Sequence, residues 1–279
     1  MKLNIKATNR ANNQLWRRRN RISLETYQEG SAVPCEIFSR LMDRLTCMHL
    51  NPERILNISI NPLWSALLLK KQFPNAKMVS LDLSLPLLMQ GRGVAGDMCC
   101  GHADAIPFQN QSMDLVVVHL SLSHYQNPVS LLHEIRRVMR DEGVLFFSHY
   151  GLDTLKRFQE ENKGQSCPLM INSFLDMHHI GDELLQSAFQ FPVVDMEHLE
   201  VSYATWWEML KDLRFMGGCM DQAGSRVSKQ AYQAWLSQGR KSAMLDLELI
   251  YGHAVASPNR GLMMEDGGVA IPLDALKRK

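Results

Sequence analysis

The sequence of 279 residues lacks the features that mark several specialised classes of protein. It contains no run of eighteen apolar residues, the length at which a segment becomes a candidate transmembrane helix. Its N-terminus lacks the apolar core of a secretory signal peptide. The formal net charge is only +1, so no overall positive field attracts nucleic acid. We therefore expect no membrane span and no nucleic-acid partner.

Cysteine pairs with the spacing of a disulfide framework or a zinc site are also missing. The cysteines are scattered, no two form a CxxC pair, and no second ligand cluster accompanies Cys99, Cys100 and His102. The sequence therefore predicts no metal site, and reduced thiols in a cytoplasmic protein. The six cysteines are Cys35, Cys47, Cys99, Cys100, Cys167 and Cys219.

Acidic residues are absent from the first 24 positions, which are rich in cations. The first acid is Glu25, and the cations before it are Lys2, Lys6, Arg10, Arg17, Arg18, Arg19 and Arg21. Three interpretations stay open: a disordered leader, a basic arm that docks an acidic partner, or a mitochondrial presequence if the source is eukaryotic.

The middle of the chain alternates apolar runs with segments of helical periodicity, the pattern of a parallel sheet covered by helices. The predicted strands are Arg54–Ile60, Lys77–Leu81, Met113–Leu120 and Gly143–His149. The predicted helices are Leu63–Phe73, Leu85–Gln90 and Pro128–Arg140.

After residue 150 the pattern changes. Helices are predicted at Thr154–Glu161, Ile180–Ser187, Thr205–Met216 and Lys229–Gln238, and strands at Val193–Val201 and Met244–Val255. The two late strands, separated by a helical insertion, predict an antiparallel edge on the sheet. We expect residues 1–45 to form a basic arm and lid helix. Residues 46–279 would form the main domain, with a small helical cap inserted at about 202–240.

Several short blocks occur in the order found in one known family. They are Leu24–Tyr27, Ala105–Phe108 with Met113–Leu115, Leu132–Val138, Asp153–Lys156, Asp176–Asp182, Asp195–Glu197, Asp212–Arg214 with Gly217, and Tyr251–Ala254. Through these blocks the chain resembles the malonyl-acyl carrier protein O-methyltransferases of biotin synthesis. The arginine hydroxylases of respiratory complex I assembly share much of the pattern. The resemblance implies a Rossmann-like class I methyltransferase fold with a mostly parallel seven-stranded sheet, S-adenosylmethionine as cofactor and malonyl-acyl carrier protein as partner.

The first turn of the implied cofactor site departs from the family pattern Asp-Leu-Gly-Cys-Gly-Thr-Gly. Asn57, Ser59 and Asn61 occupy the first, third and fifth positions, and Pro62 and Leu63 the last two. Ser59 is small and Asn61 tolerates a left-handed backbone, but Asn57 supplies no carboxylate. Pro62 removes a backbone donor and Leu63 adds an isobutyl group, so we expect a filled or narrowed pocket.

Two further positions of the implied cofactor site can be placed. Asp82 stands where the family's acid accepts hydrogen bonds from the ribose, although an acid after a strand can also be a helix cap. The family's Gly-Asp-Ala in the adenine turn becomes Gly101-His102-Ala103, so His102 replaces an acceptor carboxylate. A neutral imidazole accepts one hydrogen bond, whereas a protonated one accepts none.

On the substrate side, the resemblance implies Tyr27 in the lid, and two interpretations stay open: a hydrogen bond to the substrate, or a packing role. A cation is expected for the malonyl carboxylate. Arg214 is the first candidate, because a guanidinium binds a carboxylate through two hydrogen bonds. The alternative for Arg214 is a surface ion pair with Asp212 or Glu208. A family arginine after the fifth strand is replaced by Gln159. His178 and Asp182 are expected to organise the start of a helix behind the pocket.

Three functions follow from these residues. The first is a diverged S-adenosylmethionine-dependent carboxyl methyltransferase, and the second a catalytically inactive relative that serves as a binding or scaffolding module. The third is an assembly factor of the arginine hydroxylase type. The substituted first turn favours the second function, and the family blocks favour the first.

Overall fold

The computed structural model describes residues 32–89, 91–93, 96–122, 128–161, 169–171, 174, 176–216, 219–221, 243–258, 262–263 and 269–270. The helices are α3 (Ala32–Thr46), α4 (Pro62–Gln72), α5 (Leu85–Met89), α6 (Pro128–Val138), α7 (Lys156–Glu161), α8 (Met177–Gln186) and α9 (Trp206–Phe215). The strands of the main sheet are β1 (Arg54–Ser59), β2 (Lys77–Asp82), β3 (Asp97–Cys100), β4 (Met113–His119), β5 (Met139–Tyr150), β7 (Phe189–Tyr203) and β9 (Ala243–Ala256). Short strands β6 (Leu169–Ile171), β8 (Cys219–Asp221), β10 (Leu262–Met263) and β11 (Val269–Ala270) form two small separate sheets.

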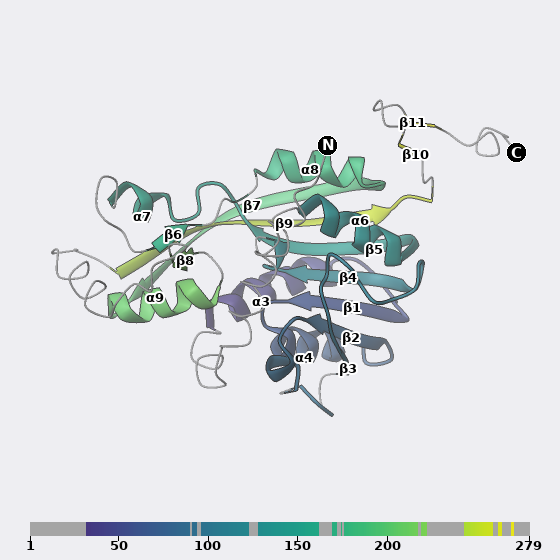
Figure 1. The fold of residues 1–279 in the computed structure, drawn as a ribbon, viewed down its shortest axis with the longest axis horizontal. Helices are drawn as coiled ribbons and strands as arrows, with labels where there is room; N and C mark the ends of the chain where they lie inside the picture. Colours follow the sequence, from purple (N-terminus) through teal and green to yellow (C-terminus); the bar gives the residue numbers. More distant parts are fainter. Residues whose placement is uncertain are drawn as a thin grey trace, which may run out of the picture.

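Seven strands form one sheet in the order β3-β2-β1-β4-β5-β9-β7 (Figure 1). Strands β1 to β5 are parallel, whereas β9 pairs antiparallel with both β5 and β7. The mostly parallel sheet with an antiparallel edge is therefore confirmed. The central strands are apolar throughout because helices cover both faces of a parallel sheet.

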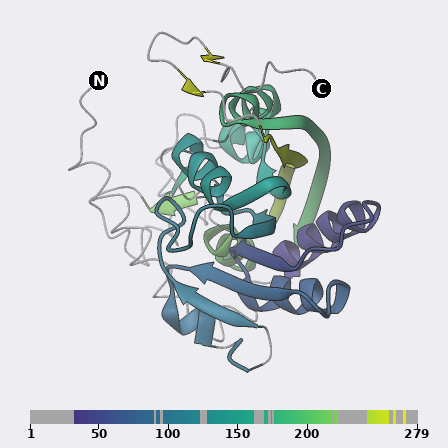
Figure 2. The ribbon, with the colours of Figure 1, turned by 90° about the vertical axis from the view of Figure 1, so that its right-hand side faces the viewer.

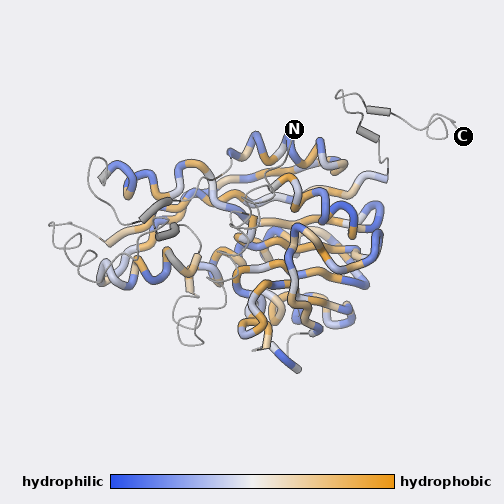
Figure 3. Tube along the Cα trace, in the orientation of Figure 1, coloured by the Kyte–Doolittle hydropathy of each residue, from blue (hydrophilic) through white to orange (hydrophobic). Residues whose placement is uncertain are grey.

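Helices pack on both faces of the sheet and enclose two apolar cores (Figures 1 and 2). Alternate residues of each strand point to opposite faces, so Leu115 and Val117 of β4 join the core under α3 and α4. Val116 and Val118 join the core under α6 and α8. The apolar colouring in Figure 3 follows the strands. Among the helices in the described ranges, none is long and apolar enough to cross a membrane.

The sequence placed a lid helix within residues 1–45 without giving its bounds, and α3 lies at the end of that range. Strand β3 and the short strands β6, β8, β10 and β11 were not predicted. Helix α3 buries Ile37, Phe38, Leu41 and Leu45, which recur at helical spacing and pack with α4 and β5. Strand β3 is a half-exposed edge strand without an apolar run, so it gives no strand signal.

The observed end of one helix differs from the predicted end because strand pairing overrides the local helical periodicity. Helix α6 ends at Val138, and the chain enters β5 directly at Met139, which pairs with Met113 of β4. The predicted helix Pro128–Arg140 was therefore two residues too long. The predicted helix Lys229–Gln238 lies outside the described residues.

The outer strand β7 runs for 15 residues along β9. Its register shifts between Gln190 and Val193, and Phe191 within this irregularity has a positive φ of 52°. Pro192 lies at the same place, as expected for a residue that cannot donate to a ladder. The start of the edge strand therefore departs from regular pairing.

Gly252 of β9 shows why one glycine of the family blocks is required. A β-carbon at this position would overlap the ring of Phe147, the residue that pairs with it on β5. Phe147 is buried in the core beneath α6 and α8, so it has little room to move.

We predict that Gly252→Ala lowers the free energy of unfolding by about 1 to 3 kcal/mol, the usual cost of overpacking a core. The matched control is Gly181→Ala in α8, where a β-carbon meets nothing within 4 Å. The control should raise stability by up to about 1 kcal/mol, because alanine favours the helix. Urea denaturation of both variants measures the difference. Equal stabilities of the two variants would contradict the packing explanation.

Candidate functional site at the carboxyl edge of the sheet

The carboxyl ends of the parallel strands gather the predicted cofactor residues along one edge of the sheet. Parallel pairing of β1 with β2 and β4 sets Ser59 opposite His119, with Asp82 at the end of β2. In open α/β sheets, ligands bind in the crevice beyond these strand ends. The sequence prediction that these positions share one site is therefore consistent with the topology.

Asn57 of the first turn is buried, and its side chain makes its hydrogen bonds within the protein. Its Nδ2 donates to Ser80 Oγ at 3.0 Å and to the Pro62 carbonyl at 3.3 Å. Its Oδ1 accepts a hydrogen bond from Ser65 Oγ at 3.0 Å. Ser65 and Ser80 are buried as well. The amide that replaces the family's acid therefore fastens β1 to β2 and α4, with both of its hydrogens engaged.

Ser59 and Asn61 also turn inward. Ser59 Oγ accepts from the Asn61 amide at 3.0 Å, and Asn61 Oδ1 accepts from the Trp64 amide at 3.2 Å, which caps α4. Asn61 has φ of −122°, so its tolerance for a left-handed backbone is not used. Pro62 follows and has no amide hydrogen.

Helix α4 is therefore capped by its own chain, and its first turn lacks a backbone donor at Pro62. Its second residue, Leu63, packs against the core beneath α3 and α4. The methionine end of S-adenosylmethionine carries an ammonium and a carboxylate. Among the described residues, the first turn supplies no acid for that ammonium and no glycine for close approach. The first turn does not fit this end of the cofactor.

The positions for the nucleoside end of the cofactor are better preserved. Asp82 is buried, its Oδ1 accepts from the Ser84 amide at 2.7 Å, and its carbonyl accepts from the Gly101 amide at 3.1 Å. Asp82 thus organises the turn after β2 and ties it to the turn after β3. Ser84 Oγ in turn accepts a hydrogen bond from the Leu87 amide in the first turn of α5.

The turn after β3 holds His102, Ala103 and Asp104. His102 is partly exposed, and its Nδ1 lies 3.6 Å from Asp104 Oδ1. Ala103 is buried in the core beneath α6 and α8. An acid is therefore present two residues after the position where the family carries one, and this turn can present both an imidazole and a carboxylate. The nucleoside end of the cofactor fits these residues better than the methionine end fits the first turn.

His119 at the end of β4 is a fully buried residue to which the sequence assigned no role. Its Nδ1 lies 2.7 Å from Ser148 Oγ, and its ring packs edge-on against Phe38 at 5.0 Å between centroids. Burial lowers the pKa of His119 to about 3. Its imidazole is therefore neutral near pH 7, and it links β4, β5 and α3.

Backbone strain accompanies the same edge. Leu120, which follows β4, has a positive φ of 51°, and its amide donates to the Ser148 carbonyl at 2.9 Å. Leu155, after β5, has φ of 63° and donates to the Asp246 carbonyl at 2.8 Å. Leucine rarely adopts this region, so both turns are strained, as are Gln111, Glu142, Ala188 and Phe191 elsewhere in the described residues.

The predicted substrate residues are only partly placed. Tyr27 lies outside the described residues. Arg214 lies in α9, but its side chain is not described. Two residues before Arg214 in α9, Asp212 Oδ2 accepts a hydrogen bond from the Tyr203 hydroxyl at 3.0 Å. Gln159 is an exposed residue of α7 and supplies no cation where the family has arginine.

Asp212 and Glu208, the candidate ion-pair partners of Arg214, each hydrogen-bond to another residue close in sequence. The pKa of Asp212 is raised by burial, although the Tyr203 hydroxyl opposes this shift. Glu208 accepts from the Thr205 amide at 3.2 Å, and Thr205 Oγ1 accepts from the Glu208 amide, which forms a capping box for α9. These contacts fix α9, the helix that carries Arg214.

Helix α8 begins in a different way from the one the sequence suggested. His178 and Asp182 were expected to organise its start, but the N-cap is Asp176, whose Oδ1 accepts from the His178 amide at 3.2 Å. Helix capping therefore explains Asp176, the first residue of the block Asp176–Asp182.

The comparisons with known proteins agree with this fold. A family model described as "Methyltransferase domain" matches residues 56–147. The chain is 30% identical over 249 residues to a malonyl-[acyl-carrier protein] O-methyltransferase of Gallionella capsiferriformans, covering 82% of this chain and 86% of that protein. A protein of the same name from Laribacter hongkongensis is 30% identical over 268 residues, covering 87% and 89%. A SAM-dependent methyltransferase structure from Thermotoga maritima superposes with a TM-score of 0.56 at 13% identity, covering 87% of this chain and all of that one.

The buried histidine predicts a specific dependence of stability on pH. Because the folded-state pKa of His119, about 3, lies below the usual 6.5, the unfolded chain binds more protons between these values. Stability contributed by neutral His119 is therefore lost as the pH falls below about 6.5. We predict that His119→Asn makes the free energy of unfolding depend less steeply on pH between about pH 4 and 6. The slope should fall by about 1.4 kcal/mol per pH unit, the value for one proton.

Denaturant titrations at several pH values measure this slope. The matched control is His133→Asn in α6, which makes the same replacement at an exposed histidine. An unchanged slope in His119→Asn would show that His119 is not held neutral in the folded protein.

Proposed function

The chain belongs to the family of malonyl-[acyl-carrier protein] O-methyltransferases, and from this premise we propose that it transfers a methyl group to a carboxylate carried by an acyl carrier protein. The proposal is supported by the class I methyltransferase fold and by Asp82, which keeps the family's acid at the carboxyl edge of the sheet. The observation that carries it is the pairing of Asp82 with the turn after β3, which keeps the nucleoside side of that edge polar and ordered.

The acceptor in this reaction needs little activation. A carboxylate with a pKa near 4 is already ionised at neutral pH, so no general base is required. S-adenosylmethionine, when bound, supplies the activated methyl group, and Asp82, His102, Ala103 and Asp104 are the residues we expect beside its nucleoside. The protein's task is to align the acceptor carboxylate and to exclude water. The first turn does not fit the methionine end, so we assign it no step.

On the acceptor side, we propose that Arg214 binds the malonyl carboxylate and that Tyr27 donates a hydrogen bond to the substrate. Helix α9 supports this role because Asp212 and the capping box of Glu208 fix it at both ends. We also propose an acidic carrier protein as the partner, because cations dominate residues 2–21.

A second function is favoured by the first turn itself. Asn57 and Asn61 make their side-chain hydrogen bonds to their own chain, and α4 is capped from within. The turn is thus stable without a ligand. A catalytically inactive relative that binds the same carrier protein would have this property, and the two functions differ in whether S-adenosylmethionine binds.

We predict that the folded protein binds S-adenosylhomocysteine weakly, and that Leu63→Ala strengthens this binding while Asp82→Ala abolishes it. Leu68→Ala is the matched control: Leu63 and Leu68 are both partly buried leucines of α4, but only Leu63 lies in its first turn. Calorimetric titration measures all four proteins. Micromolar binding corresponds to about 8 kcal/mol, and each tenfold change to about 1.4 kcal/mol.

Transfer of a labelled methyl group from S-adenosylmethionine to malonyl-acyl carrier protein then tests the reaction. Ester formation by the wild type that Asp82→Ala eliminates would support the first function. No binding at millimolar ligand by a folded wild type, together with retained binding of the carrier protein, would refute it and support the second.

A further inference from the structure

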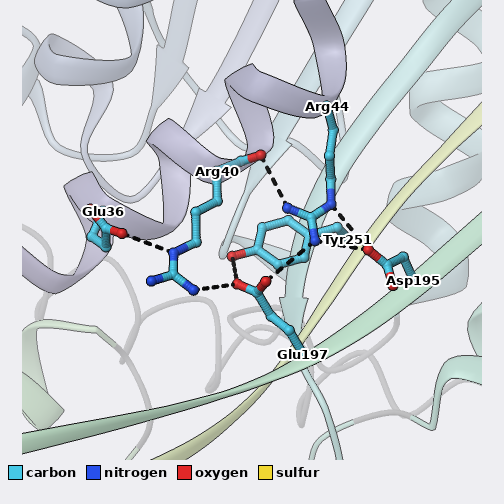
Figure 4. A network of polar contacts seen from close by, with 6 residues as sticks. All are labelled: Glu36, Arg40, Arg44, Asp195, Glu197 and Tyr251. Carbon is cyan, nitrogen blue, oxygen red and sulfur yellow. Dashed lines mark hydrogen bonds and ion pairs between the residues drawn. The ribbon is translucent and has the colours of Figure 1, made fainter. Parts of the chain in front are cut away.

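Helix α3 is fastened to the antiparallel edge of the sheet by a cluster of charged residues (Figure 4). Arg40 Nη1 lies 2.9 Å from Glu197 Oε1, and Arg44 Nη2 lies 2.8 Å from Asp195 Oδ2 and 3.4 Å from Glu197 Oε2. Tyr251 of β9 donates to Glu197 Oε1 at 3.0 Å. The Glu197 carboxylate thus accepts hydrogen bonds from Arg40, Arg44 and Tyr251.

The cluster is more than a pair of surface ion pairs. The Glu197 side chain is 26% exposed, and the Arg44 guanidinium stacks over the Tyr251 ring at 4.0 Å from its centroid. Burial disfavours the Glu197 carboxylate, but hydrogen bonds from Arg40, Tyr251 and Arg44 outweigh burial and lower its pKa. The carboxylate is therefore ionised and held in one orientation.

The other half of α3 lies against the candidate site. Cys35 Sγ accepts a hydrogen bond from Asn61 Nδ2 at 3.4 Å, and Phe38 packs on His119 at the end of β4. Asn61 caps α4 in the first turn. One helix therefore contacts the first turn and the end of β4 with its first half, and the antiparallel edge with its second half.

The acids and the tyrosine belong to two blocks that the candidate site leaves unexplained. Asp195 and Glu197 come from the block Asp195–Glu197, and Tyr251 opens the block Tyr251–Ala254. The two blocks lie side by side, because Asp195 pairs with Tyr251 across β7 and β9. Their polar side chains converge on α3.

We propose that Glu197 is a positioning residue: by holding Arg40 and Arg44 it fixes α3 against the first turn and the end of β4. The proposal rests on the proposed function, because the first turn is part of that candidate site. On this proposal, the antiparallel edge controls the distance between α3 and Asn61. A purely structural ion pair would stabilise the whole fold without a specific effect at Cys35.

The test compares Glu197→Gln with Glu36→Gln. Each variant removes one carboxylate that binds Arg40, but Glu36 lies in α3 itself, four residues before Arg40, and does not reach the sheet. Cys35 is partly exposed, so its reaction with iodoacetamide reports whether α3 separates from Asn61. Peptide mass spectrometry separates Cys35 from Cys99 of β3, which serves as an internal reference.

We expect Glu197→Gln to accelerate alkylation of Cys35 about fivefold, in line with loss of a partly buried ion pair, and to leave Cys99 unchanged. Glu36→Gln should leave both rates unchanged. Asp195→Asn, which removes one partner of Arg44 only, should give a smaller acceleration at Cys35. Urea denaturation run in parallel reports global stability.

Equal Cys35 rates in Glu197→Gln and the wild type would overturn the proposal. Acceleration of Cys35 and Cys99 together, with a matching loss of global stability, would also overturn it, since this is the behaviour of a general stabilising contact. The labelling needs no ligand. If Cys35 alone is accelerated and the wild type binds no S-adenosylhomocysteine, the positioning role stands and the proposed catalytic function fails.

Discussion

Parallel pairing of β1 with β2 and β4 is the constraint on which the rest of the structure depends. Because these strands run in one direction, every turn that leaves them emerges at the same edge, and residues far apart in sequence meet there. Asp82, His102 and His119 reach that edge from three different strands or turns. The same constraint buries both faces of the sheet and requires helices on each side. Helix α3 satisfies this requirement on the face that carries His119.

The first turn illustrates a competition between ligand and protein for the same polar groups. In a ligand-binding turn, some donors and acceptors stay unsatisfied until the ligand arrives, and this lowers the stability of the free protein. Here Asn57, Ser59 and Asn61 satisfy one another and their neighbours, so the turn gains stability without a ligand. Any ligand at this position must break bonds as well as form them. The first turn and the turn after β3 have therefore diverged to different degrees on one inherited scaffold.

The sequence predicted the central strands well, because apolar runs bounded by turn residues are a strong signal for buried strands. It also predicted the antiparallel edge. It did not predict β3, whose half-exposed residues lack periodicity, or the role of His119, whose burial follows from packing against Phe38 on a distant helix. The helix start at Asp176 was misassigned to its neighbours, since several polar residues there could serve as caps. The cluster at Glu197 joins three segments, and no local pattern brings them together.

The irregular start of β7 has a consequence for the protein in a crowded solution. A strand of 15 residues at the end of a sheet offers a long row of backbone groups to any other chain, which is a route to polymerisation. Pro192 interrupts that row, Phe191 is turned out of it by its positive φ and is 73% exposed, and the exposed acid Glu200 repels a copy of the same edge. The strand that holds α3 through Asp195 and Glu197 is thus protected against self-association by other residues.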